Sequence, residues 1–293
     1  MNFLLSIQKF ITELLLTLAT ILKIGIGTKP YSNPVDSKRS YHCIILGNGP
    51  SLSTSLKVQE NLIEDYDRIG VNHFAESELY AIIKPSIYVL NAPEMWMDNV
   101  EPFYHEKGIK LFNSLRDHTS WEINLFIPFN AKKYKRWQNI LVENPKIQVA
   151  FFNTTPIEGF KFFRYFCYNH NLGMPRPHNV MIPSLMIALS LNYTSIYLLG
   201  ADHSWLKNIS VTEENEVLLT QKHFYDKNSA IPRPMDNQGK GSRKLYEVLQ
   251  KFVYAFEGYF EIEAYSSTRK QKIINCTEGS YIDAFTRSAI PEK

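Results

Sequence analysis

The sequence predicts an α/β fold with a Rossmann-like, doubly wound parallel sheet and an N-terminal amphipathic helix. Short apolar runs alternate with helical segments between residues 42 and 200, as in parallel sheets covered by helices on both faces. The first run ends in a glycine-rich turn, and residues 3–26 are a long apolar segment with polar residues at helical spacing. We therefore expect a helix at 1–27, a linker at 28–40 and one domain of catalytic size at 41–290.

Composition narrows the function classes. The chain has 293 residues and is 44% hydrophobic, which is enough for a large core. A net charge of +3 is too small to favour nucleic acid as a partner. The cysteines, Cys43, Cys167 and Cys276, are odd in number and widely spaced, so neither a disulfide framework nor a metal-ligand spacing is indicated. These features fit a reducing compartment.

The N-terminal segment predicts a helix with one polar stripe. The stripe consists of Ser6, Lys9, Glu13, Thr17, Thr20 and Lys23. Because Glu13 interrupts the apolar run, a spanning segment of about 20 apolar residues is not cleanly supplied. We expect the wide apolar face to lie in a membrane interface or on a partner, with packing on the domain's own core as the alternative. Prolines and turn formers predict the linker that follows.

The turn after the first apolar run has the composition of a phosphate-binding loop. Gly47 and Gly49 allow close approach of a ligand, and Pro50 suits the first turn of a helix whose positive end attracts anions. The full dinucleotide fingerprint fails, because Leu52 stands where the third glycine belongs. A tight strand-to-helix connection without a ligand is the alternative.

The other elements follow from apolar runs and the turn residues beside them. We expect parallel strands at 42–46, 68–71, 86–90, 109–112, 195–199 and 272–275. Helices are expected at 52–66, 179–191 and 242–256. Residues 121–166 are rich in Phe, Tyr and Lys and give no clear pattern. The polar stretch from 203 to 241 is predicted to be irregular, as in a lid or a binding loop.

Polar residues stand at the ends of four predicted strands. These residues are Asn48, Asn72, Asn91 and Asp202. A neutral amide both donates and accepts hydrogen bonds, so it can bind hydroxyls, phosphate oxygens and base edges. Each asparagine alone is more typical of a turn, but equivalent positions at one sheet edge predict a shared ligand.

The same segments resemble known families. Gly47–Leu52, Val71–Phe74 and Val89–Pro93 are similar to the first three strand ends of bacterial sialyltransferases that use CMP-sialic acid. Ile196–Asp202 resembles the strand beside the sugar nucleotide in that family. With Asn275–Ser280 added, the segments look even more like the MptE-like domain, which is found in proteins of bacterial surface-glycan loci and in a pterin pyrophosphokinase. The resemblance covers most of residues 41–288.

The resemblance implies a fold, a substrate and site residues. It implies a sialyltransferase-like variant of the GT-A fold, in which Asn48, Asn72 and Asn91 contact CMP. Asp202 would lie at the sugar-nucleotide edge, and His223 is the best match to the family's catalytic histidine. The complete set is His223, Tyr225 and Asp202 for catalysis, with Gly47, Asn48, Gly49, Ser51, Asn72, Asn91, Asn179, Asp202 and Arg233 for binding. The family's Ser/Thr-Gly pair near the donor is replaced here by His178-Asn179-Val180.

The residue types fit transfer of a sugar from CMP to a hydroxyl. A histidine can deprotonate the acceptor hydroxyl near neutral pH. CMP carries one phosphate, so Tyr225 and Arg233 could stabilise its departure without a metal or another cofactor. We expect an inverting glycosyltransferase that acts on a surface glycan such as lipopolysaccharide, capsule or glycoprotein. It would lie peripherally at the cytoplasmic face of the inner membrane, and oligomers remain possible.

Two other functions stay open. One is a pyrophosphokinase that moves a diphosphate from ATP to a pterin alcohol, with Mg²⁺ held by carboxylates such as Asp202. The other is a membrane-docked nucleotide-binding protein without turnover. Binding of CMP without metal separates the transferase from the kinase, and a functional base in the cleft separates it from the binding protein.

Overall fold

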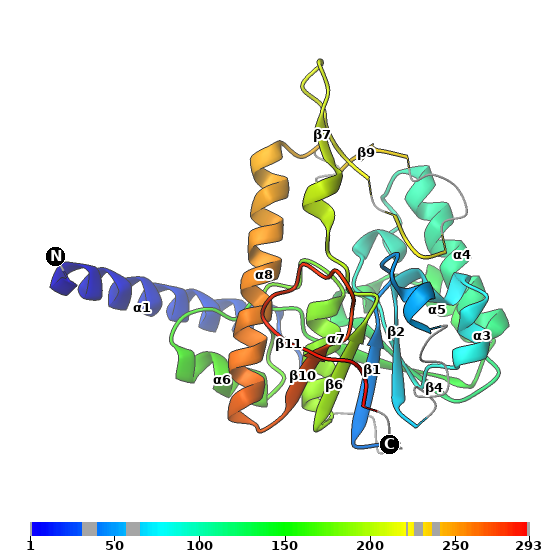
Figure 1. Ribbon diagram of the computed structural model, residues 1–293, viewed down its shortest axis with the longest axis horizontal. Helices are drawn as coiled ribbons and strands as arrows, with labels where there is room; N and C mark the ends of the chain where they lie inside the picture. Colours follow the sequence, from blue (N-terminus) through cyan, green and yellow to red (C-terminus); the bar gives the residue numbers. More distant parts are fainter. Residues whose placement is uncertain are drawn as a thin grey trace.

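The computed structural model describes residues 2–30, 40–56, 65–220, 222–225, 231–235 and 241–291. Its centre is an eight-stranded parallel sheet (Figure 1). From one edge to the other, the strands are β11 (Thr286–Arg287), β10 (Lys272–Asn275), β6 (Ser195–Leu199), β1 (His42–Leu46), β2 (Asp67–Val71), β3 (Ile87–Val89), β4 (Ile123–Pro128) and β5 (Ile147–Phe152). The order runs outward from β1 in both directions, so the chain reverses between β1 and β6.

Strand β1 lies in the middle of the sheet, where successive side chains are buried on alternate faces. Cys43 and Ile45 join the hydrophobic cluster on one face, and Ile44 and Leu46 join the cluster on the other. All four are fully buried. A continuous apolar run is therefore what a central parallel strand requires.

Helices cover both faces, which makes a three-layer α/β/α arrangement. One face carries α6 (Lys161–Asn169), α7 (Met181–Ser190) and α8 (Leu245–Thr268). The other carries a helical segment at residues 52–56, α3 (Leu79–Ile83), α4 (Pro102–His118) and α5 (Arg136–Leu141). Short 3₁₀ turns are η1 (Asn72–Glu76), η2 (Pro93–Met95), η3 (Phe129–Lys133) and η4 (Trp205–Asn208).

The polar stretch after β6 contains a second sheet, where we predicted irregular structure. It consists of β7 (Ile209–Val211), β8 (Val217–Leu219) and β9 (Arg233–Pro234), all antiparallel. Val217 and Leu219 of β8 pack against Val248 and Phe252 of α8. Two apolar residues on one face of a short strand are enough to hold it on the helix, and that signal is easily missed in a polar segment.

The predicted strand at 109–112 is wrong, because these residues lie inside α4. Gly108, Leu111, Phe112 and Leu115 are buried at helical spacing, and Pro102 occupies the first turn. The chain instead places β4 and β5 within residues 121–166, where no strand was predicted. The predicted strands at 42–46, 195–199 and 272–275 are confirmed to the residue.

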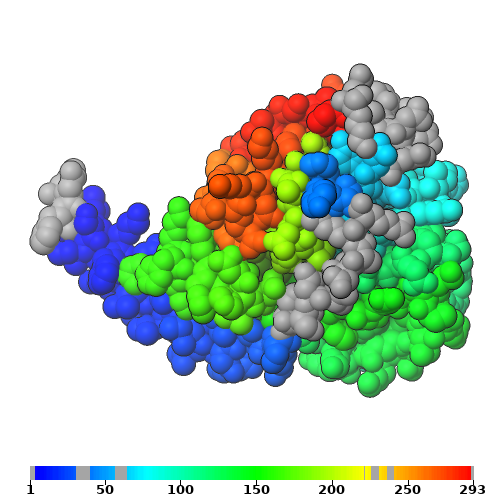
Figure 2. All heavy atoms as spheres, turned by 90° about the horizontal axis from the view of Figure 1, so that it is seen from below, coloured from blue at the N-terminus to red at the C-terminus, as the bar shows by residue number. Residues whose placement is uncertain are grey.

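Helix α1 (Asn2–Gly27) projects from the body (Figures 1 and 2). The part of its polar stripe from Glu13 to Lys23 contacts the domain. Thr17 and Thr20 are buried; their hydroxyl oxygens accept hydrogen bonds from the backbone N–H groups of Phe160 (3.0 Å) and Glu158 (3.1 Å). Lys23 Nζ lies 2.9 Å from the Glu158 carboxylate. The apolar side chains of α1 are mostly exposed, although Ile24 packs against the core of the domain. The surface that the apolar face contacts stays a prediction.

Two predicted segments fall largely outside the described residues. The linker at 28–40 includes residues 31–39, and the helix at 52–66 includes residues 57–64. The start of the linker is held against the domain: the Thr28 hydroxyl donates to the Leu172 carbonyl at 2.9 Å, and Asn153 bonds both polar backbone groups of Lys29.

Candidate functional site

A cleft of about 630 Å³ opens at the carboxyl edge of the sheet. Asn48, Asn72, Asn91 and Asp202, from the ends of β1, β2, β3 and β6, all line it. Its other wall comes from the segment before α7, from α8 and from residues 203–225. The structure therefore brings the predicted strand-end residues together at the point where the strand order reverses, which is where α/β sheets bind ligands.

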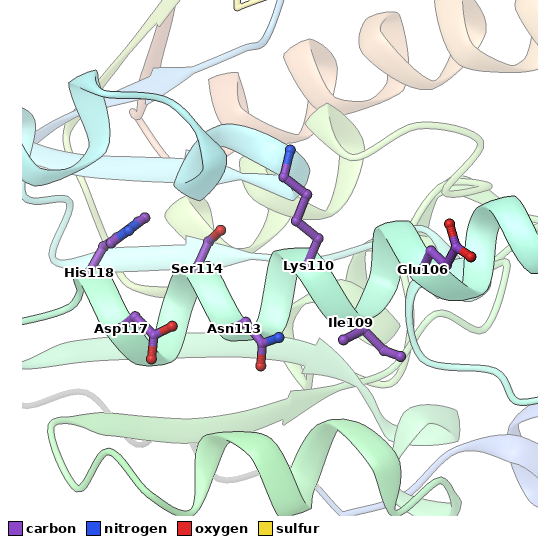
Figure 3. A pocket seen from close by; sticks show the side chains of 7 residues that line it. All are labelled: Glu106, Ile109, Lys110, Asn113, Ser114, Asp117 and His118. Atoms are coloured by element: carbon purple, nitrogen blue, oxygen red, sulfur yellow. The ribbon is translucent and has the colours of Figure 1, made fainter.

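A shallower hollow of about 350 Å³ runs along α4 (Figure 3). Its seven lining residues all belong to this one helix. One of them, Lys110, already pairs with Glu76 at 2.9 Å. A binding site normally needs polar groups that converge from several elements, so the cleft at the sheet edge is the better candidate.

The glycine-rich turn is shaped by strand packing. A side chain on Gly47 would overlap the Gly200 carbonyl oxygen, and one on Gly49 would overlap the Asp202 carboxylate. Neither glycine has a positive φ, so the requirement is space between β1 and β6. Both glycines also line the cleft, so their role in ligand approach stays a prediction beside this packing role.

Asp202 occupies the start of the following helix, where we expected a phosphate. Its carboxylate accepts hydrogen bonds from the Ser51 hydroxyl (2.8 Å) and the Ser51 backbone N–H (3.2 Å). A carboxylate at this place satisfies free N–H groups of the helix and interacts favourably with its dipole. Ser51 itself does not line the cleft, so Asp202 and Ser51 act first as a link between β6 and β1.

Asn48 and Asn72 each use one end of the amide to bond the neighbouring strand end. Asn48 Nδ2 donates to the Val71 carbonyl at 3.1 Å. Asn72 Oδ1 accepts from the backbone N–H of Asn91 at 3.1 Å, and Asn72 has a φ of 44°, a conformation that asparagine tolerates well. Because the partners are backbone groups, they decide which end of each amide is oxygen.

Asn91 and Asn179 continue this series across the cleft. Asn91 Nδ2 donates to the carbonyls of Pro177 (3.0 Å) and Asn179 (3.2 Å). Asn179 Oδ1 accepts from the backbone N–H of Met181 at 2.9 Å, at the start of α7. These bonds tie β3 to the segment before α7 and fix the orientation of both amides.

Among the described residues, each of the four asparagine side chains has one amide atom without a hydrogen-bond partner. Asn48 Oδ1 and Asn179 Nδ2 are buried without a hydrogen bond. Within the described chain, Asn72 Nδ2 and Asn91 Oδ1 also lack one. The set therefore offers two acceptors and two donors, and a buried polar atom left unpaired costs about 1–3 kcal/mol. A ligand that pairs with these atoms would remove that cost.

His203 is held rigidly beside Asp202. Its ring lies 4.2 Å from the Trp205 ring and 5.5 Å from the Tyr259 ring, and its Nδ1 is 3.0 Å from the Tyr259 hydroxyl. The same hydroxyl donates to Asn179 Oδ1 at 3.1 Å. A tyrosine hydroxyl has one proton, so His203 Nδ1 must carry the proton of its own bond to Tyr259.

This proton count fixes the tautomer of His203. Burial lowers its pKa to about 3, so the ring is neutral at physiological pH. With the proton on Nδ1, the other ring nitrogen, Nε2, is an acceptor. Because His203 lines the cleft, it can accept a hydrogen bond from a ligand hydroxyl or N–H. The sequence analysis did not assign this role, although the position directly after Asp202 was a signal.

We expect histidine ¹⁵N NMR spectra to show His203 as the neutral tautomer with a proton on Nδ1 from pH 5 to 8. Tyr259→Phe removes the oxygen that accepts from Nδ1, so the population of the other tautomer should rise while the protein stays folded. His170, whose Nδ1 bonds the Phe166 carbonyl at 2.8 Å far from Tyr259, should keep its signals and serves as the control. A dominant Nε2–H tautomer in the wild-type protein would contradict the assignment.

His223 and Tyr225 line the cleft on the segment before β9, and Asp202, which follows β6, lines it too. Their rings are stacked at 5.1 Å with an interplanar angle of 5°. Phe224 between them donates its backbone N–H to the Asn48 carbonyl at 3.1 Å, which anchors this segment to the end of β1. Arg233 does not line the cleft; its guanidinium lies 4.1 Å from the Phe103 ring centre.

Several cleft residues were missed by the sequence analysis. They are Arg176, His178, Arg243 and Lys251. Arg176 and His178 flank Pro177, whose carbonyl accepts a hydrogen bond from Asn91, whereas Lys251 lies on α8 and Arg243 just before it. Isolated basic residues on a helix give no sequence signal, because most of them face solvent.

Comparison with known proteins gives no further guidance on this site. No model of a known protein family matches the chain, and a search of curated proteins found no match either. The functional argument therefore rests on the cleft. In the part of the chain that the structure describes, no group of three or more His, Cys, Asp or Glu residues is arranged to hold a metal ion.

Proposed function

We propose that this protein is an inverting, metal-independent glycosyltransferase that uses a CMP-activated sugar, with a Rossmann-like sheet of the sialyltransferase type. The donor sugar would be sialic-acid-like or another sugar, and the acceptor a bacterial surface glycan. The observation that carries the proposal is the set of four asparagines that line the cleft, three at the sheet edge and Asn179 across from them, each with an amide atom that has no partner among the described residues. Neutral donors and acceptors in this arrangement suit a nucleoside monophosphate.

The reaction can be written with the residues of the cleft. The acceptor hydroxyl oxygen forms a bond to the anomeric carbon while the bond from that carbon to the CMP phosphate oxygen breaks. The hydroxyl proton passes to His223, and CMP departs with the bonding electron pair. Tyr225, beside His223, would donate a hydrogen bond to the departing phosphate.

A thermal-shift panel tests this function. The full chain is heated with CMP, CDP, UDP, GDP or ATP, each with EDTA or with Mg²⁺. CMP with EDTA should raise the melting temperature, since a ligand at 100 times its Kd stabilises the folded state by about 2.7 kcal/mol. Asn48→Ala should weaken this binding by about 1–3 kcal/mol without unfolding the protein. Stabilisation by ATP alone, and only with Mg²⁺, would favour the pyrophosphokinase instead.

In α1, polar side chains contact the domain and most apolar side chains are exposed. This orientation supports attachment to a membrane surface. Among the described residues, Leu4–Gly27 is the one segment long and apolar enough to cross a bilayer. Its polar stripe, however, is used for contacts with the domain, and its apolar side chains face away. Phe162 and Phe166 of α6 extend this exposed apolar surface, next to the contact between Phe10 and Phe160. We propose that α1 lies in the interface of the inner membrane, at its cytoplasmic face.

Two substitutions on the outer face of α1 test this attachment. Leu15 and Leu22 are 60% and 67% exposed, so changing both to Gln should leave the melting temperature unchanged. Binding to vesicles of phosphatidylethanolamine and phosphatidylglycerol should fall by about tenfold or more, because each leucine loses apolar burial in the lipid. Val142→Gln changes an apolar residue that is 78% exposed just after α5, and should have no effect. Unchanged vesicle binding of the double variant would refute the proposal.

A further inference from the structure

We propose that the end of the cleft beside α8 is a binding subsite for an oxyanion, either a phosphate or a carboxylate group. Arg176, Arg243 and Lys251 form it around His178. The subsite deepens the proposed function, on which its role in substrate binding rests. Anion binding itself can be measured without a sugar donor or turnover.

The four residues come from two elements that Tyr254 of α8 holds together. The Arg176 guanidinium lies 4.8 Å from the centre of the Tyr254 ring, and the His178 ring stacks on that ring at 5.3 Å with an angle of 15°. Lys251 is on the same helix, and Arg243 is just before it. All four line the cleft. The basic groups are therefore placed by packing rather than by mobile surface side chains.

Positive charge at this end exceeds the negative charge that faces it. Arg176 pairs with Glu158 at 2.7 Å, but Glu158 also pairs with Lys23. In the described part of the chain, neither Arg243 nor Lys251 forms an ion pair. Glu94 also lines the cleft, and its charge partly offsets the lowering of the Lys251 pKa that burial and Arg243 cause.

The titration behaviour of His178 and Lys251 reflects this excess. Burial lowers the pKa of His178 to about 4, helped by the charges of Lys251, Arg176 and Arg243. Burial and the charge of Arg243 likewise lower the pKa of Lys251. Burial disfavours any charge, but the contribution of the neighbouring cations to these shifts is one that favours an anion. In addition, Arg243 Nε and His178 Nε2 are buried and have no hydrogen-bond partner.

The residue types define the ligand. Guanidinium groups bind the paired oxygens of phosphate and carboxylate, and an ammonium group adds a point charge. In a CMP-sugar transferase, the oxyanion could be the donor phosphate, the carboxylate of an acidic sugar or a phosphate on the acceptor. In each case the bound group has at least two oxygens that share negative charge. Separate titrations with phosphate and with a sugar acid identify which group binds.

The pKa of His178 is the readout for the full-length protein. We expect addition of inorganic phosphate, or of free N-acetylneuraminic acid, to raise this pKa from about 4 by about one unit, because a bound anion offsets the surrounding cations. Histidine NMR measures it, with His178→Asn assigning the signal. A response to phosphate alone assigns the subsite to a phosphate, and a response to the sugar acid alone assigns it to a carboxylate.

Variants separate the subsite from general charge effects. Lys251→Met and Arg243→Gln should each weaken anion binding about tenfold. Without an anion, each should also raise the pKa of His178, since a repelling cation is gone. Lys272→Met, at the exposed start of β10, should change neither anion binding nor the pKa of His178. If phosphate and the sugar acid both leave the His178 pKa unchanged, the subsite is refuted even where CMP binds. Anion binding without CMP binding would refute the transferase instead.

Discussion

Replacing His223 with alanine is expected to lower turnover by about 10²–10⁴-fold, the usual effect of losing a general base. The affinity for CMP should hardly change, because the base acts on the acceptor hydroxyl and not on the nucleotide. His223 lies in the cleft, is only partly buried and stacks on Tyr225, so the substitution leaves the hydrophobic core intact. Steady-state rates with a CMP-sugar, together with the thermal shift caused by CMP, measure both quantities.

His203 is the decisive comparison, since it also lines the cleft and its Nε2 can accept a proton. If His203→Ala abolishes turnover and His223→Ala does not, the proton acceptor lies beside Asp202. The pH profile tests His203 independently. His203, with a pKa lowered to about 3, would stay deprotonated and active as the pH falls through about 6.5, the usual pKa of a histidine. If neither histidine matters, the proposed mechanism fails.

Gly47→Ala is expected to destabilise the fold by about 3 kcal/mol, at the upper end of typical overpacking. The added methyl group would overlap the Gly200 carbonyl oxygen and lie 2.8 Å from its carbon. These are backbone atoms of the loop after β6, so relief requires β1 and β6 to separate at the centre of the sheet. At roughly 2–4 °C per kcal/mol, the melting temperature should fall by about 6–12 °C.

Gly25→Ala in α1 is the matched control, because no atom lies within 4 Å of the added methyl position. It should leave the melting temperature unchanged or slightly higher, as alanine is the better helix former. A melting temperature of Gly47→Ala close to that of the wild type would mean that the β1–β6 contact is looser than the structure indicates. The glycine-rich turn would then be available for a ligand after all.

The central strands were predictable because their signals are local. In β6, an apolar run ends at Leu199 and is followed at once by Gly200, so both limits are visible in the sequence. Strand β5 lacks such a signal, since it lies at the sheet edge and exposes Gln148 and Val149. Its place is decided by pairing with β4, and a single segment carries no information about its partner.

The site was predictable only as far as topology determines it. Parallel strands end at one edge, so Asn48, Asn72 and Asn91 were expected to meet, and they do line one cleft. Which amide atom faces a ligand depends on backbone partners far along the chain, such as the Pro177 carbonyl. The link between Asp202 and the helix start likewise depends on the separation of β1 and β6, which packing sets.

The neutral histidines of the cleft make the folded state sensitive to acid. An unfolded chain takes up protons on both histidines as the pH falls through about 6.5. In the folded protein, His178 takes up a proton only near its pKa of about 4, and His203 only near its pKa of about 3. Between these limits the unfolded state binds more protons, so folding stability is lost as the pH falls. An anion bound beside His178 would raise the pKa of His178 in the folded state, and so narrow the pH interval between its folded and unfolded pKa values. A substrate anion would therefore also extend the range of acidity in which the protein stays folded.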